Sequence, residues 1–172
     1  GGLFYAPLSE LPVRPVKFLD GAAPSPNAVA WEVLERLRVI AGGEEFASAA
    51  RKERAILAAV ARRIPAGSYY ALFLGSRALQ PQVTVAVIGP AESSETRALL
   101  EVVRREASDG TIVLFARNDA EAAETTWPLF AGRRMLGGRP TAYVCMGRTC
   151  LPPATSAREL GALLVRSRET KP

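Results

Sequence analysis

The sequence predicts an α plus α/β fold, in which a helical segment comes first and a small α/β unit containing a βαβ motif follows it. Between residues 27 and 79, apolar side chains recur at helical spacing. From residue 83 onwards, short β-branched runs alternate with helical segments. The period changes at Pro81, so we expect two domains that join near Gln80, residues 1–80 and residues 81–172.

The first domain is expected to hold an opening loop and three helices. Five prolines among the first 26 residues predict an extended opening segment, because proline fixes φ and lacks a backbone donor. Helical spacing then predicts helices over residues 27–41, 44–64 and 68–79. We expect the third of these helices to be mostly buried, because most of its side chains are apolar.

The second domain is expected to contain three strands. Two continuous β-branched runs, residues 83–89 and 111–116, flank one helical segment. A strand, a helix and a strand with short joints predict a parallel pair with a right-handed crossover. A third strand is expected over residues 141–145. The last helix should begin at the Ser156-to-Glu159 capping box.

The composition excludes several kinds of catalytic and metal site. There is no histidine in the chain, which excludes Ser-His-Asp and Cys-His catalysis and histidine zinc sites built from it alone. Two cysteines are too few for a structural zinc site. We therefore expect no metal and no cofactor, and the catalytic residues stay unknown. Whether the chain is part of an enzyme stays open.

The distribution of charged and apolar residues indicates which classes of partner to expect. The net charge is +5, but arginines stand beside acids, as in residues 51–54 and 101–106, which is typical of solvated helix faces with ion pairs. We expect no nucleic-acid partner. Apolar runs stay far below the length of a membrane span and no signal peptide opens the chain, so we expect no membrane partner and a cytoplasmic location. The start at Gly1, without Met, predicts a fragment of a longer protein.

Cys145 and Cys150 are one candidate site. If Gly147 and Arg148 form the tip of a tight hairpin, the cysteines face each other in a non-hydrogen-bonded pair. The Cα atoms of such a pair are about 4.5 Å apart, which allows a redox disulfide. The alternative is two small buried apolar residues beside a turn. The CxxxxC spacing favours this alternative, because it lacks the helix N-terminus that lowers a thiol pKa in CxxC motifs.

Asp20, Ser25 and Asn27 are the other candidate site, in a stretch of small and polar residues just before a buried helix. In a cavity, the carboxylate would act as an acid or base and the amide would orient a hydroxylated ligand. The spacing alone favours a structural alternative, in which Ser25 or Asn27 caps the helix and Asp20 closes a turn.

Three stretches of the chain, residues 13–30, 85–89 and 139–153, resemble the C-terminal part of the YyaL-type thioredoxin-domain proteins, which include spermatogenesis-associated members in animals. The most specific motifs are Asp20…Pro24-Ser25-x-Asn27 and Pro140-Thr141-Ala142-Tyr143-Val144-Cys145. The resemblance implies that a thioredoxin-like domain precedes this segment. It also implies that residues 1–80 are the last helices of an (α/α)6 barrel of the six-hairpin glycosidase type, followed by a terminal α/β appendage.

The resemblance also assigns the candidate residues. Asp20, Ser25 and Asn27 match a family loop, Asp-x-x-x-Pro-Ser-Gly-Asn, that would face the barrel lumen, so a sugar-like small molecule is the expected ligand. Pro26 stands where the family has glycine, which puts the loop geometry in question, because proline cannot take a positive φ. The two cysteines match the family's C-terminal pair, while the thioredoxin CxxC is absent here.

Three functions follow as expectations. The first is an ancillary structural role as the C-terminal fragment of such a protein, with a contribution to a carbohydrate-like pocket. The second is a non-enzymatic interaction module that docks the rest of the parent protein or a second copy through a helical face with Trp31, Leu34 and Leu37. The third is thiol redox through Cys145 and Cys150.

Overall fold

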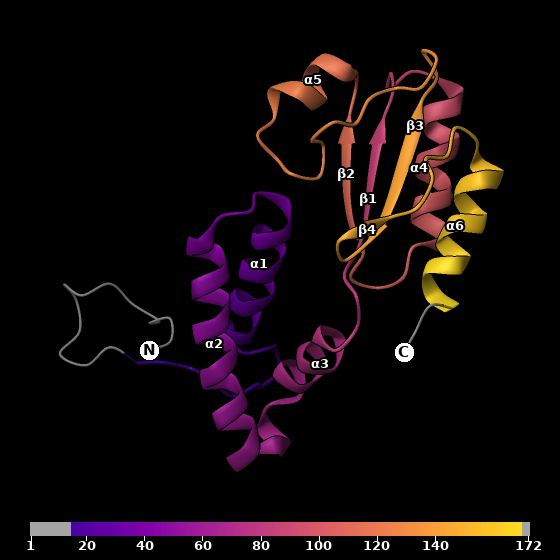
Figure 1. The fold of residues 1–172 in the computed structure, drawn as a ribbon. Coiled ribbons are helices and arrows are strands. Elements are labelled where there is room, and N and C mark those ends of the chain that lie inside the picture. Colours follow the sequence, from indigo (N-terminus) through magenta and orange to yellow (C-terminus); the bar gives the residue numbers. More distant parts are fainter. Residues whose placement is uncertain (1–14, 170–172) are drawn as a thin grey trace. The chain divides into compact units, whose positions relative to one another are not determined.

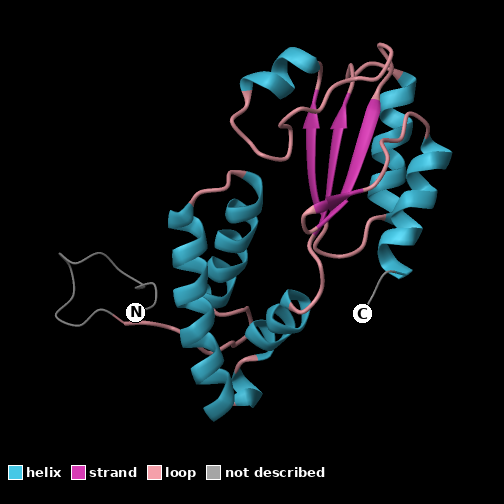
Figure 2. Cartoon of the chain, in the orientation of Figure 1, coloured by secondary structure: helices cyan, strands magenta, loops and turns pink. Residues whose placement is uncertain are grey.

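The computed structural model describes residues 15–169, and the chain divides into two compact units between Leu79 and Gln80. Figure 1 traces the order of the elements along the chain, and Figure 2 shows that the first unit is helical whereas the second holds the sheet. An α plus α/β class is therefore confirmed. Within the described residues, every helix is too short or too polar to cross a membrane.

The first unit consists of three α-helices and one short 3-10 turn. They are α1 (Pro26–Ile40), α2 (Glu44–Arg63), the 3-10 turn η1 (Pro65–Gly67) and α3 (Tyr69–Ala78). The three helices therefore lie close to their predicted positions. Pro26 occupies the first turn of α1. Backbone N–H groups there have no acceptor within the helix, so proline loses no hydrogen bond, and its fixed φ suits a helix. Proline at this position is thus compatible with the loop.

Helices α1 and α2 pack against each other, and α3 contacts both. Their buried apolar side chains form one cluster: Ala28, Trp31, Ala50, Leu57, Ala71 and Leu74. The prediction that α3 is mostly buried was wrong, because Tyr69 is 67% exposed and Leu72 and Phe73 are each 47% exposed. Two neighbouring helices cover only one stripe of α3, which leaves the other apolar side chains of that helix outside the core.

The second unit is built on a four-stranded sheet in the order β2-β1-β3-β4. Strand β1 (Val83–Ile88) pairs in parallel with β2 (Ile112–Ala116), and the crossover between them carries α4 (Ser94–Glu106), as predicted. Strand β3 (Thr141–Met146) runs antiparallel to β1 on its other side. The short strand β4 (Thr149–Cys150) completes a hairpin with β3.

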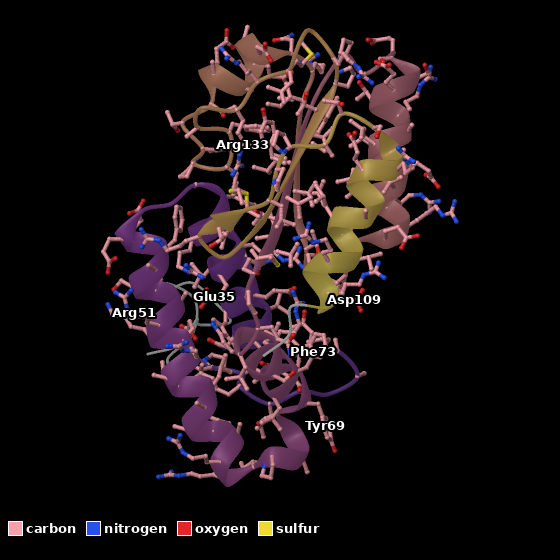
Figure 3. The ribbon with its side chains drawn as sticks, turned by 45° about the vertical axis from the view of Figure 1, so that its right-hand side comes forward. Glu35, Arg51, Tyr69, Phe73, Asp109 and Arg133 are labelled. Atoms are coloured by element: carbon pink, nitrogen blue, oxygen red, sulfur yellow. A yellow bond between two sulfur atoms is a disulfide. The ribbon has the colours of Figure 1, made fainter. Side chains whose placement is uncertain are left out.

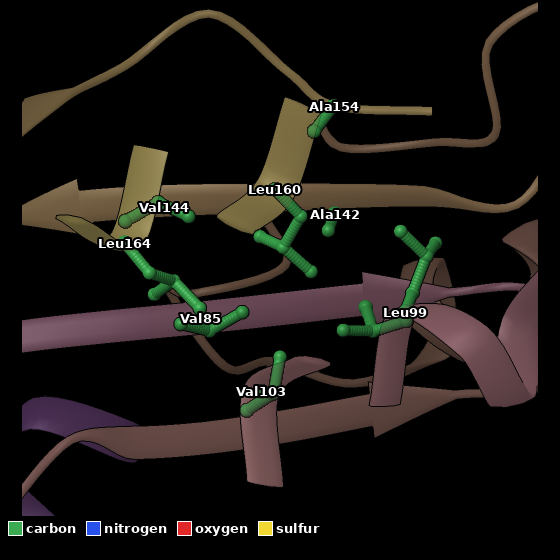
Figure 4. Close-up of a cluster of buried hydrophobic side chains, with 9 residues drawn as sticks. Val85, Leu99, Val103, Ala142, Val144, Ala154, Leu160 and Leu164 are labelled. Atoms are coloured by element: carbon green, nitrogen blue, oxygen red, sulfur yellow. The ribbon is translucent and has the colours of Figure 1, made fainter. Parts of the chain in front are cut away.

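Helices α4 and α6 (Ala157–Glu169) pack against each other on one face of the sheet (Figure 1). The predicted capping box is present at the start of α6, because the Glu159 N–H donates to Ser156 Oγ at 3.3 Å and the Ser156 N–H donates to Glu159 Oε2 at 3.2 Å. Figure 4 shows the core between helices and sheet. Its buried residues are Val85, Val87, Leu99, Val103, Ala142, Val144, Ala154, Leu160 and Leu164.

The register of the sheet decides which side chains reach its other face. Val85 lies opposite Val144, and both belong to the core on the helix-covered face. Side chains alternate along a strand, so Tyr143 and Cys145 point to the opposite face. A long connection from β2 to β3, which begins with α5 (Asp119–Glu124), supplies the residues that meet Tyr143 and Cys145 there.

Candidate functional site

In the Asp20 loop, the carboxylate of Asp20 joins the start of α1 to the start of α3. Its Oδ1 accepts from the Ser25 N–H at 2.7 Å, and its Oδ2 accepts from the Tyr70 N–H at 2.8 Å. The Asp20 N–H itself donates to the Gly67 carbonyl oxygen at 2.8 Å. Asp20 therefore does more than close a local turn, since Tyr70 lies 50 residues further along the chain.

Ser25 and Asn27 are both fully buried. Ser25 is the N-cap of α1, because its Oγ accepts from the Ala28 N–H at 3.1 Å. Asn27 does not cap the helix: its Nδ2 donates to the Lys17 carbonyl oxygen at 2.8 Å and so ties the preceding chain to α1. The structural alternative thus describes the contacts of Ser25, whereas Asn27 anchors a segment ten residues upstream.

A second polar cluster links α1 to α3 and was missed by the sequence analysis. Tyr70 donates its hydroxyl to Glu32, which also forms an ion pair with Arg36 at 2.7 Å and lies 3.8 Å from Arg77. Burial raises the pKa of Glu32, but the Tyr70 hydrogen bond and the arginines outweigh it and hold that pKa below its ordinary value. The same hydrogen bond raises the pKa of Tyr70. The cluster is therefore suited to hold the helices together, with Tyr70 neutral and Glu32 charged.

Glu53 is a buried acid on the core side of α2. It is only 7% exposed, and its Oε2 has no hydrogen-bond partner. Burial raises the pKa of this carboxyl group. A single carboxylate does not make a metal site, and among residues 15–169 no cluster of three or more Cys, Asp or Glu side chains could hold a metal ion.

The helical docking face was predicted from Trp31, Leu34 and Leu37, and Trp31 does not lie at the surface. Trp31 is only 3% exposed and belongs to the core of the first unit, and Leu34 packs against that core. The apolar face of α1 turns inward there because α2 and α3 cover it. Other apolar side chains of α1 and α3 are exposed, and we call them the α1–α3 apolar set: Val29, Val33, Tyr69, Leu72 and Phe73. Figure 3 labels Tyr69 and Phe73 on α3.

In the second unit, Cys145 of β3 and Cys150 of β4 lie directly opposite each other and form a disulfide. Gly147, with φ of +57°, stands first in the two-residue loop between them, as a type II′ hairpin turn requires. Their Cα atoms are 3.9 Å apart, closer than the distance expected from the sequence. The alternative of two buried residues was wrong for Cys150, which lies exposed on the short outer strand while Cys145 is 2% exposed.

Arg133 completes this site and was also missed by the sequence analysis, since it lies 12 and 17 residues before the cysteines with no spacing signal. One guanidinium nitrogen, Nη2, lies 3.0 Å from Cys145 Sγ and 3.3 Å from Cys150 Sγ. The other, Nη1, donates to the Leu129 carbonyl oxygen. Figure 3 labels Arg133 and draws the disulfide sulfurs in yellow.

An aromatic ring holds this guanidinium from a second side. The centre of the Arg133 guanidinium lies 5.6 Å from the centroid of the Tyr143 ring, which is close enough for a cation–π contact. The Tyr143 hydroxyl donates to the Arg134 carbonyl oxygen at 2.7 Å, which fixes the ring against the Arg133 loop. Burial lowers the pKa of Arg133, so this is a partly desolvated cation beside two sulfur atoms.

Comparison with known proteins gives a distant relationship. No family model matches the chain, and no solved structure matches it. Spermatogenesis-associated protein 20 of Homo sapiens is 26% identical over 169 residues, which cover 95% of this chain and 22% of that protein. The Rattus norvegicus protein of the same name is 25% identical over 157 residues, covering 91% and 20%. The chain thus spans about a fifth of the length of the curated relatives it matches, and it is weakly similar to them over most of its own length.

Proposed function

We propose that this chain is the C-terminal part of a longer YyaL-type protein and has an ancillary structural role there. The observation that carries the proposal is the α1–α3 apolar set, which stays exposed although the first unit already has a closed core around Trp31 and Leu57. The short span of the relatives that the chain covers supports it as well. In the parent protein, the first unit would provide the last helices of an (α/α)6 barrel, behind a thioredoxin-like domain.

The partner that fits these exposed side chains is another apolar helix face of the same longer protein. Leu72 and Phe73 of α3 and Val33 of α1 are each 47% exposed. Fully burying an apolar side chain of this size contributes about 1.5–3 kcal/mol. Half-exposed residues contribute less each, so the partner has to cover several of them at once.

For the Asp20 loop, the contacts favour structural support over direct ligand contact. Both carboxylate oxygens of Asp20 already accept backbone N–H groups, and Ser25 and Asn27 are fully buried. A contribution to a sugar-like pocket would therefore be made through the shape of the loop. In the full-length protein, we expect Asp20→Ala and Asn27→Ala to weaken sugar binding in proportion to the stability that the first unit loses. If the first unit loses stability and sugar binding does not change, the loop does not contribute to a pocket.

The docking proposal is tested by light scattering of the chain alone and mixed with the separately produced remainder of its parent protein. We expect the remainder to bind the chain, and we expect Val33→Ser with Leu72→Ser to weaken that binding. Val165→Ser is the matched control, because Val165 is similarly exposed, at 43%, but lies on α6 of the second unit. A chain that stays monomeric and does not bind the remainder of the parent protein would contradict the proposal.

A second function, reversible thiol–disulfide exchange, is favoured by one specific observation, the disulfide between Cys145 and Cys150, of which Cys150 is exposed. We propose it for a cytoplasmic location, where glutathione keeps most thiols reduced and a disulfide is transient. Intact mass measurement tests it. The chain should lose two hydrogens on mild oxidation and regain them with excess glutathione, whereas a pair that glutathione never reduces would have only a structural role.

A further inference from the structure

We infer that Arg133 stabilises the thiolate that forms when the Cys145–Cys150 disulfide opens, and that a small-molecule thiol of the glutathione class opens it at Cys150. This inference rests on the thiol–disulfide exchange proposed above and adds to it the direction of attack and the residue that assists it. Both come from the arrangement of three side chains in the second unit.

The direction of attack follows from exposure. An attacking thiolate must approach one sulfur in line with the disulfide bond, so it needs access to that sulfur. Cys150 is exposed on β4, whereas Cys145 is 2% exposed on the buried strand β3. Attack at Cys150 makes Cys145 the leaving group. The buried sulfur then receives the electron pair.

The exchange consists of two successive displacements at sulfur. A glutathione-class thiolate forms a bond to Cys150 Sγ, the bond between the two protein sulfurs breaks, and Cys145 Sγ leaves with the electron pair as a thiolate. A second thiolate then attacks the glutathione sulfur of the mixed disulfide and releases Cys150 Sγ as a thiolate. The sum is two thiols oxidised to one small-molecule disulfide and one protein disulfide reduced to two thiols, with protons exchanged with water.

Arg133 is placed to stabilise both thiolates. Its Nη2 lies 3.0 Å from Cys145 Sγ and 3.3 Å from Cys150 Sγ, so one donor group reaches either sulfur. A guanidinium stays charged at any physiological pH, and a neighbouring cation favours the thiolate over the thiol. Because a stabilised thiolate is a better leaving group, the same contact speeds the opening of the disulfide.

The surroundings of Arg133 leave its charge available for this purpose. Within residues 15–169, it forms no ion pair with a carboxylate, unlike Arg36 or Arg104, which pair with neighbouring glutamates. Its remaining contacts are the Leu129 carbonyl oxygen and the Tyr143 ring, both of which hold the side chain in place. A partly desolvated cation without a counter-charge gains most from an anion that appears beside it.

A purely structural role of Arg133 is the competing explanation, in which it only fastens the loop around Leu129 to Tyr143. That role does not depend on the protonation state of the cysteines. The two explanations therefore differ in the pH dependence of thiol reactivity, which is what the experiment measures.

The experiment uses the whole chain in two single-cysteine variants, Cys145→Ser and Cys150→Ser, and follows uptake of glutathione from its disulfide by intact mass. We expect Cys145→Ser, which keeps the exposed thiol, to take up one glutathione at least about tenfold faster than Cys150→Ser. Equal rates, or faster uptake by Cys150→Ser, would overturn the direction of attack.

The role of Arg133 is measured by the pH profile of iodoacetamide alkylation in both single-cysteine variants, because Cys150→Ser keeps Cys145, the sulfur that leaves first, and Cys145→Ser keeps Cys150. We expect the midpoint to lie at lower pH in the folded chain than in urea, and Arg133→Gln to move it to higher pH while Arg133→Lys restores part of the effect. Arg158→Gln is the control, with the same loss of charge on α6, across the sheet from the cysteines. In a chain that keeps both cysteines, Arg133→Gln should also raise about tenfold the glutathione concentration at which half of the disulfide is reduced.

The outcomes separate this inference from the function on which it rests. If glutathione reduces the wild-type pair but the midpoints of Arg133→Gln and Arg158→Gln coincide, the exchange function stands and the role of Arg133 is refuted. If no excess of glutathione reduces the pair, the exchange function itself fails. If Arg133→Gln does not fold, the comparison of the folded and urea-unfolded single-cysteine variants decides, and equal midpoints in Cys150→Ser would refute a stabilised Cys145 thiolate.

Discussion

Asp20→Ala is the perturbation that most directly tests how the first unit is held together. The substitution removes two acceptors at once, Oδ1 for the Ser25 N–H at 2.7 Å and Oδ2 for the Tyr70 N–H at 2.8 Å. The Tyr70 N–H belongs to the first turn of α3, where backbone donors lack a partner within the helix. Asp20 thus serves α3 as a cap supplied by a distant part of the chain.

The expected loss follows from these two contacts. Removing a capping acceptor costs typically about 1 kcal/mol. A partly buried donor left without a partner costs about 1–3 kcal/mol. Because Asp20 serves one donor at each of two elements, we expect Asp20→Ala to lower the free energy of unfolding of the first unit by about 2–3 kcal/mol. Asp20→Asn keeps one carbonyl acceptor, and about half of that loss is expected.

The assay is urea unfolding followed by the fluorescence of Trp31, which is buried in the first unit. A Trp127→Phe background removes the tryptophan of the second unit, so that the signal reports on the first unit alone. Asp109→Ala is the control, because Asp109 is exposed, and exposed sites usually change stability by less than about 0.5 kcal/mol. Equal midpoints for Asp20→Ala and Asp109→Ala would refute the bridging role.

Three further predictions concern stability and pH. Glu53→Gln should raise the free energy of unfolding at pH 7 by about 1 kcal/mol, because the folded chain no longer buries a carboxylate oxygen without a partner. Urea unfolding measures this change, and a lower free energy of unfolding would contradict the prediction. Because the pKa of Glu32 is lower in the folded chain, Glu32 should contribute fully to stability above its ordinary pKa of 4.5, and this contribution should be lost as the pH falls below 4.5. The free energy of unfolding, measured over a pH series, should therefore fall less steeply at acid pH in Glu32→Gln than in the wild-type chain. Gly89→Ala should cost about 1–3 kcal/mol, because its Cβ would lie 2.7 Å from Pro140 Cβ; a stable variant with an unchanged melting temperature would show that the end of β1 can move.

Some features of this protein could be read from residues close together in the sequence. The three helices of the first unit and the parallel β1–β2 pair follow from periodicity and turn residues within a few positions of each other, as does the position of the α1 cap to within two residues. The opposition of Cys145 and Cys150 was open to the same reasoning, because a two-residue loop sets the register of a hairpin, but the CxxxxC spacing favoured two buried residues instead.

Other features could not be read in this way, because they join residues far apart in the chain. Asp20 reaches Tyr70, and Arg133 reaches two sulfurs across a connection with no regular spacing. The apolar face of α1 was visible in the sequence, but its use was not, and Trp31 turned out to be core rather than surface. Which neighbour covers an amphipathic helix depends on the whole packing, which no local pattern encodes.

The sequence by itself therefore determined the three helices of the first unit, the parallel β1–β2 pair and the capping box of α6, and left open the N-cap of α1 and the pairing of the cysteines. Only the tertiary structure decided that β3 runs antiparallel beside β1, that the Asp20 carboxylate fastens two helices, and that a cation lies against the disulfide. The physical reason is the range of the interactions. Backbone sterics and side-chain periodicity act over a few residues, whereas strand order and the partner of a buried polar group are decided by how the whole chain packs.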